Sequence, residues 1–89
     1  MKYYAFVSIY TIEQLQNNLK KYIIRSNALD FQFMTTIQVI EATDKSEAQN
    51  KYLNLYDEEI EDFMSKLNTN QSAPIHILTK EEYEKIFLL

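Results

Sequence analysis

The sequence lacks cysteine, glycine and tryptophan and has one histidine and one proline among its 89 residues. Without cysteine there is neither a disulfide nor a thiolate zinc site, and small secreted domains usually need such cross-links, so we expect a cytoplasmic protein. Without glycine, the phosphate-binding loops of P-loop and Rossmann proteins are excluded, because their backbone must close on the anion. The lone His76 predicts neither a histidine metal site nor a His-based triad. We therefore predict no cofactor, no metal and no catalytic residues.

Positive charge is also scarce, with nine Lys and Arg against thirteen Asp and Glu and a net charge of −4. The acidic excess lies in residues 41–62, which hold two basic and eight acidic residues. A nucleic-acid-binding protein normally has a basic face, so we expect no direct binding of DNA or RNA. No apolar run is long enough for a signal peptide or a membrane span, so we expect no membrane association.

What the sequence does contain is ordinary globular composition, with 46% hydrophobic and 25% charged residues. This favours a folded protein over a disordered one. A chain of this length has room for one hydrophobic core, so we predict a single domain, residues 1–89, of modest stability.

The hydrophobic pattern alternates between strands and helices. Residues 3–10 are apolar at both alternating sets of positions, which is typical of a central strand covered on both faces. Residues 30–42 alternate as a strand with one wet face and a bend near Thr35 and Thr36. Apolar residues at helical spacing follow in 45–67, a length that suggests a kink near Asp57. The remaining elements are helices over 12–25 and from residue 80 onward, and a short strand over 75–78.

Three predicted helices begin with a capping box, in which a residue with a short polar side chain precedes Glu or Gln by three positions. The pairs are Thr11 with Gln14, Asp44 with Glu47, and Thr79 with Glu82. The fold class is α+β, a small two-layer domain of order β-α-β-α-β-α. We expect helices packed on a sheet of three strands, or of four in a ferredoxin-like arrangement.

Five carboxylates and one isoleucine make up residues 57–62. A solvated helix face explains them most simply. Calcium binding needs oxygens along a loop with a glycine at its turn, and acid–base catalysis needs a buried cleft that separates two pKa values. Neither fits contiguous acids on a helix. The functional interpretation is recognition of a basic partner.

Seven tyrosines are the second unusual feature. Tyrosine packs at the boundary of cores, and it is also enriched at protein interfaces. Tyr52 and Tyr56 are one helical turn apart and lead into the acidic run, an arrangement of aromatic anchors beside a charged rim. The predicted partner-binding residues are Tyr52, Tyr56, Asp57, Glu58, Glu59, Glu61 and Asp62.

The leading hypothesis is a non-enzymatic interaction module that binds, and thereby inhibits, a protein with a basic surface. The strand–turn–helix order over 37–48, together with the richness in Lys, Asn, Ile and Tyr, is typical of small phage and mobile-element proteins, which suggests such an origin. One alternative is an acidic decoy that occupies the nucleic-acid-binding site of a host protein. Another is a structural homodimer that covers a sheet edge or a spare apolar face of the first strand.

Overall fold

The computed structural model describes residues 1–18, 34–67 and 73–87 of the chain. Within these ranges three strands and four helices follow one another in the order β-α-β-α-α-β-α. None of these helices is both long enough and apolar enough to cross a membrane. The elements are β1 (Lys2–Val7), α1 (Ile12–Asn18), β2 (Gln38–Glu41), α3 (Lys45–Leu55), α4 (Asp57–Ser65), β3 (Ile75–Thr79) and α5 (Lys80–Phe87).

β1 is the central strand of an antiparallel sheet with the order β2-β1-β3. The central position predicted for the first strand is confirmed, although the strand ends at Val7 rather than at residue 10. Ser8 still donates its N–H to the Pro74 carbonyl at 3.2 Å. Its hydroxyl accepts the Tyr10 N–H at 2.9 Å, and this local hydrogen bond turns the chain away from the sheet.

The bend predicted near Thr35 and Thr36 is a β-bulge. Ser8 pairs with Met34, and Ala5 pairs with Gln38. The chain therefore advances four residues from Met34 to Gln38 while the opposite strand advances three, from Ala5 to Ser8. The extra residue interrupts the ladder and bends the strand. The predicted strand 30–42 is shorter in its described part. Strand structure there is limited to 38–41 and to the single bridge at Met34.

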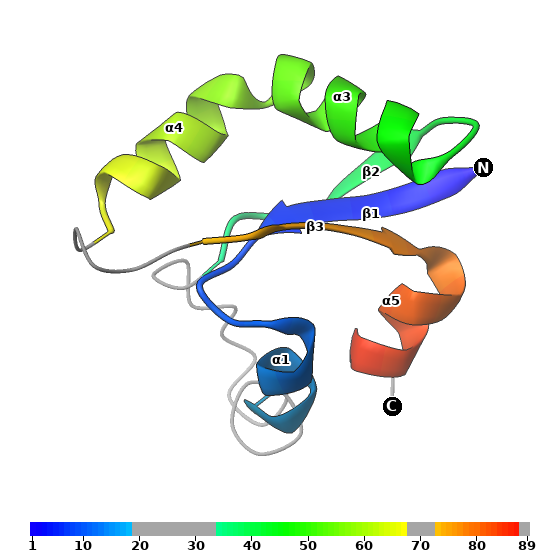
Figure 1. The fold of residues 1–89 in the computed structure, drawn as a ribbon, viewed down its shortest axis with the longest axis horizontal. Helices are drawn as coiled ribbons and strands as arrows, with labels where there is room; N and C mark the ends of the chain where they lie inside the picture. Colours follow the sequence, from blue (N-terminus) through cyan, green and yellow to red (C-terminus); the bar gives the residue numbers. More distant parts are fainter. Residues whose placement is uncertain (19–33, 68–72, 88–89) are drawn as a thin grey trace.

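Helices cover both faces of the sheet, with α3 and α4 on one side and α1 and α5 on the other (Figure 1). Alternate side chains of β1 pack on the two sides of the sheet, because successive side chains of a strand point to opposite faces. Tyr3, Ala5 and Val7 pack under α3 and α4, whereas Phe6 packs with α1 and α5. The predicted α+β domain with helices on a small sheet is confirmed, and the division of its core into two clusters follows from the two apolar faces of β1.

The capping boxes are confirmed in full at two helices and in half at the third. Thr79 and Glu82 exchange side-chain-to-backbone hydrogen bonds of 3.0 and 3.1 Å at the start of α5. Thr11 makes the same exchange with its partner at α1. At α3 the Asp44 side chain accepts the Glu47 N–H at 2.8 Å, but the Glu47 carboxylate binds other groups.

Two predictions fall partly outside the described residues. The predicted helix 12–25 is described as α1 only to Asn18, and residues 30–33 of the predicted second strand are likewise not described. The described ranges contain three strands, so they show no fourth, ferredoxin-like strand.

Candidate functional site

The acidic segment begins where the predicted long helix 45–67 divides into α3 and α4. The break is at Tyr56, whose φ of −123° and ψ of 27° leave the helical region. Tyr56 nevertheless donates its N–H to the Tyr52 carbonyl and accepts from the Ile60 N–H, both at 3.0 Å. The kink predicted near Asp57 is therefore confirmed, and it redirects the chain while keeping these backbone hydrogen bonds.

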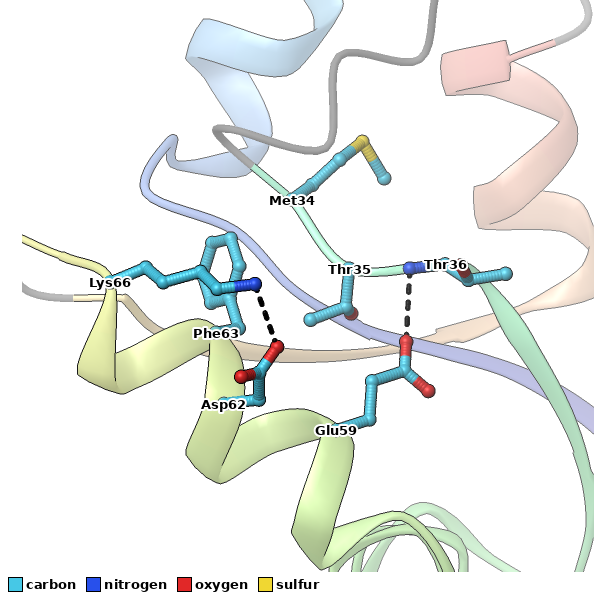
Figure 2. A pocket seen from close by; sticks show the side chains of 7 residues that line it. All are labelled: Met34, Thr35, Thr36, Glu59, Asp62, Phe63 and Lys66. Carbon is cyan, nitrogen blue, oxygen red and sulfur yellow. Dashed lines mark hydrogen bonds and ion pairs between the residues drawn. The ribbon is translucent and has the colours of Figure 1, made fainter.

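The inner face of α4 is fixed to the rest of the domain. Ile60 and Phe63 are buried in the cluster beneath α3 and α4. The Glu59 side chain turns toward the bulge, where it accepts the Thr36 N–H at 3.2 Å (Figure 2) and a Gln38 side-chain N–H at 3.4 Å. Glu59 therefore belongs to the attachment of α4 to the sheet and not to its free surface.

The outer face of α4 is formed by four exposed carboxylates, Asp57, Glu58, Glu61 and Asp62, which we call the acidic face. Asp62 forms an ion pair with Lys66 at 2.9 Å (Figure 2). The other three make no ion pair with any described residue. A shallow hollow in this surface is lined by Glu58, Glu61, Asp62 and Ser65.

Helix stability alone does not account for the acidic face. Asp57 and Glu58 lie in the first turn of α4, where negative charge interacts favourably with the helix dipole. Glu61 and Asp62 lie one turn later and repel Asp57 and Glu58 at the i, i+4 spacing. Such like-charged pairs destabilise a helix by a few tenths of a kcal/mol each. Asp62 recovers this cost through its own i, i+4 ion pair with Lys66, so Glu61 is the acid whose cost no ion pair of the described residues offsets.

Tyr52 has a different place from the one predicted. Its side chain is completely buried, and its hydroxyl lies 3.2 Å from Thr35 Oγ1. That Thr35 oxygen also accepts the Val7 N–H at 2.9 Å. Burial raises the pKa of Tyr52, because the phenolate would lose its hydration. As a fully buried core residue, Tyr52 cannot act as a surface anchor in this structure, whereas the half-buried Tyr56 keeps part of its ring accessible.

A cavity of about 130 Å³ separates the bulge from α4 (Figure 2). It has space for a few water molecules but is smaller than the pockets of roughly 300–1,000 Å³ that hold cofactors or drug-sized ligands. The hydrogen bond between Thr36 and Glu59 beside this cavity could not be predicted, because the two residues are 23 positions apart and no local pattern links them. The residues around the cavity are Met34, Thr35, Thr36, Glu59, Asp62, Phe63 and Lys66.

His76 is buried on β3, on the opposite face from Ile75 and Ile77. Its ring lies against Phe6, with centroids 5.0 Å apart, and Nε2 is 3.0 Å from the Tyr10 carbonyl oxygen. Burial lowers the pKa of His76, and the hydrogen bond to Tyr10 opposes that shift only in part. These contacts tie β3 to the segment before α1 and give His76 a structural role.

The structure brings together four of the seven predicted residues on the acidic face and turns Tyr52 and Glu59 inward, with Tyr56 at the helix break between them. Within the described ranges, no group of three or more His, Asp and Glu residues is arranged to hold a metal ion. No family model, curated protein or solved structure matches this chain, so the acidic face has to be interpreted from its own chemistry.

Proposed function

We propose that this protein is a non-enzymatic binding module that recognises a basic surface of another protein through the acidic face of α4. The observation that carries the proposal is the set of three exposed carboxylates, Asp57, Glu58 and Glu61, that have no cationic partner in the described structure. They lie on a helix whose opposite side is anchored by Ile60 and Phe63. A partner would thus meet a preformed arrangement of charge and would not have to order it.

The extent of the acidic face favours a protein groove over mimicry of a nucleic acid. A nine-residue helix is about 13 Å long, at roughly 1.5 Å per residue. DNA presents one charge per ~1.7 Å of helix axis along its whole length, so a decoy would need a longer charged surface. Arg and Lys side chains in a compact groove match four carboxylates better.

Inhibition is the consequence that we propose when the basic surface is the partner's own working site. The absence of cysteine fits a cytoplasmic setting, and a phage or mobile element acting on a host protein is the biological hypothesis that goes with it.

The test compares two variants with the same change in net charge. Replacing Asp57→Asn, Glu58→Gln and Glu61→Gln neutralises the unpaired acids, whereas Glu13→Gln, Glu81→Gln and Glu84→Gln neutralise three acids on α1 and α5. Each exposed charge contact contributes about 0.5 kcal/mol, so the first variant should bind about tenfold more weakly to a partner isolated from a lysate of the source cells. The second variant should bind as the wild type does.

Binding of the purified partner is then measured at two salt concentrations. We expect the affinity of the wild type to fall as the salt concentration rises, and the first variant to show a shallower dependence. Equal affinities of the wild type and the first variant, or the absence of any retained partner, would contradict the proposal. If added nucleic acid displaces the partner from the wild type, the result would instead support the alternative of an acidic decoy in a nucleic-acid-binding site.

A further inference from the structure

The cavity between the bulge and α4 is lined by two carboxylates and one ammonium group. Glu59 and Asp62 lie on the side of α4 that faces the bulge, and Lys66 reaches Asp62 from the end of the helix (Figure 2). All the lining residues belong to the described part of the chain. One of the two negative charges therefore has no cation beside it among these residues.

Glu59 is the carboxylate without a cation, and it is half-buried. Its Oε1 accepts the Thr36 N–H at 3.2 Å, and its Oε2 accepts a Gln38 side-chain N–H at 3.4 Å. A carboxylate has about four lone-pair sites, shared between its two oxygens. Each oxygen of Glu59 therefore keeps a site for another donor. A guanidinium group uses such a pair of sites through two parallel hydrogen bonds.

The walls of the cavity favour a guanidinium group over an ammonium group. Phe63 and Met34 are almost completely buried and form its apolar lining. Guanidinium is flat, weakly hydrated and able to stack on aromatic surfaces, whereas ammonium is compact and strongly hydrated. A space of about 130 Å³, enough for a few water molecules, accommodates a guanidinium carbon with its nitrogens.

The cavity is continuous with the acidic face. Asp62 belongs to both, because it lines this cavity and also the shallow hollow beside Glu58 and Glu61. A protein that binds the acidic face therefore comes within reach of Glu59. Lys66 does not block the way, since its side chain is 73% exposed and an exposed ion pair contributes little stability.

We propose that this cavity receives the guanidinium group of an arginine side chain of the basic partner. The guanidinium group hydrogen-bonds to both oxygens of Glu59 and packs against Phe63, while Lys66 moves aside. The inference rests on the proposed function, because the protein that meets the acidic face supplies the arginine. It adds a preference for arginine over lysine at one position of that partner.

The first test uses ethylguanidinium as the probe and ethylammonium as its matched control. Each is titrated at constant ionic strength to about 50 mM, since so small a ligand binds in the millimolar range, and the backbone amides are followed by NMR. Ethylguanidinium should shift the Thr36 amide signal to saturation, and ethylammonium should bind roughly tenfold more weakly. The absence of a saturable shift, or equal affinities for the two probes, overturns the proposal.

Two variants locate the binding. Glu59→Gln keeps an oxygen that accepts the Thr36 N–H but loses the charge, so it should bind ethylguanidinium roughly tenfold more weakly. Glu81→Gln, with the same change in charge on α5, should bind as the wild type does. Lys66→Gln removes the competing cation and should bind about twofold more tightly.

Lys66→Gln changes an exposed side chain, so it keeps the test decisive if Glu59→Gln fails to fold by circular dichroism. A folded Glu59→Gln that binds the probe like the wild type contradicts the proposal. Equal or weaker binding by Lys66→Gln contradicts it as well.

The source of the guanidinium group is tested with the partner isolated through the acidic face. Glu59→Gln should bind that partner roughly tenfold more weakly than the wild type does. Equal binding would assign the cavity to a free guanidinium compound and overturn the role of a partner's arginine. The two proposals fail separately. If ethylguanidinium does not bind, the comparison of the acidic-face variants still stands, and if no partner is retained, the NMR titration still stands.

Discussion

Thr35 joins three segments of the domain through one hydroxyl group. In a regular ladder the Val7 N–H would bind the backbone carbonyl of the opposite residue, but at the bulge it binds Thr35 Oγ1 instead. The Thr35 N–H still binds the Val7 carbonyl at 2.9 Å, and the Tyr52 hydroxyl completes the group. A side chain thus replaces a backbone acceptor where the extra residue interrupts the sheet.

This arrangement predicts different costs for two conservative substitutions. Thr35→Val leaves both the Val7 N–H and the Tyr52 hydroxyl without their partner and should lower the free energy of unfolding by about 2–4 kcal/mol. Tyr52→Phe removes only the outer hydroxyl and should cost about 1 kcal/mol. Urea unfolding measures both, with Thr35→Ser as the control that keeps the hydroxyl. Equal costs for the two substitutions would show that Thr35 does not support the bulge in this way.

His76 predicts a pH dependence of stability. Its pKa in the folded state is lowered from the ordinary value of 6.5 by burial, so the unfolded chain binds a proton more readily. Stability is then full above about pH 6.5 and falls as the pH drops toward the folded-state pKa. Unfolding by urea between pH 7.5 and 5.5 should show this loss, and His76→Gln, which does not titrate, should show a smaller one. A parallel decline in both proteins would assign the effect to other groups.

Among the elements, α5 shows how much a local pattern can establish. The capping box of Thr79 and Glu82 was predictable because its two residues are three positions apart and need no tertiary contact. The ion pair of Glu82 with Lys45, at 2.8 Å, was not, since it joins the start of α5 to the start of α3. Hydrogen bonds from Lys45 and Thr79 lower the pKa of Glu82.

Two substitutions separate the cap from this ion pair. Thr79→Ala removes the side-chain acceptor of the Glu82 N–H and should cost about 1 kcal/mol of folding stability. Glu82→Gln can keep the hydrogen bond to the Thr79 N–H while losing the charge, so it should cost less, as expected for an exposed ion pair. Thermal unfolding at neutral pH shows which of the two substitutions lowers the stability more. A larger loss for Glu82→Gln would mean that the ion pair, not the cap, stabilises this end of α5.

The second long helical pattern shows where periodicity is insufficient. The spacing of Ala48, Tyr52 and Leu55 predicts that the three residues share the helix face that packs on the core. The interpretation of Tyr52 as a surface anchor conflicted with that prediction. The burial of Tyr52 resolves the conflict in favour of periodicity. Leu55 departs from the pattern because its exposure depends on where the sheet ends, which the sequence of α3 does not encode.

At the scale of the whole molecule, the sequence predicted the class, the central strand and most helix starts. It did not predict the bulge contacts of Glu59, because they depend on which distant segments become neighbours. The four acids of the acidic face were identified correctly as a group on one surface, since neighbouring positions on a helix need no tertiary information. Their role as a binding site is a proposal that the charge variants test.

The central place of β1 also has a kinetic consequence. Lys2 pairs with Glu41 and Tyr3 with Thr79, so the two edges of β1 meet partners 39 and 76 positions away. Closing such long loops costs chain entropy before any contact compensates for it, and folding slows as the average sequence separation of contacts rises. The helices can form early from their own caps. The rate of folding should therefore be set by the encounter of β1 with β3, which brings together the two ends of the described chain.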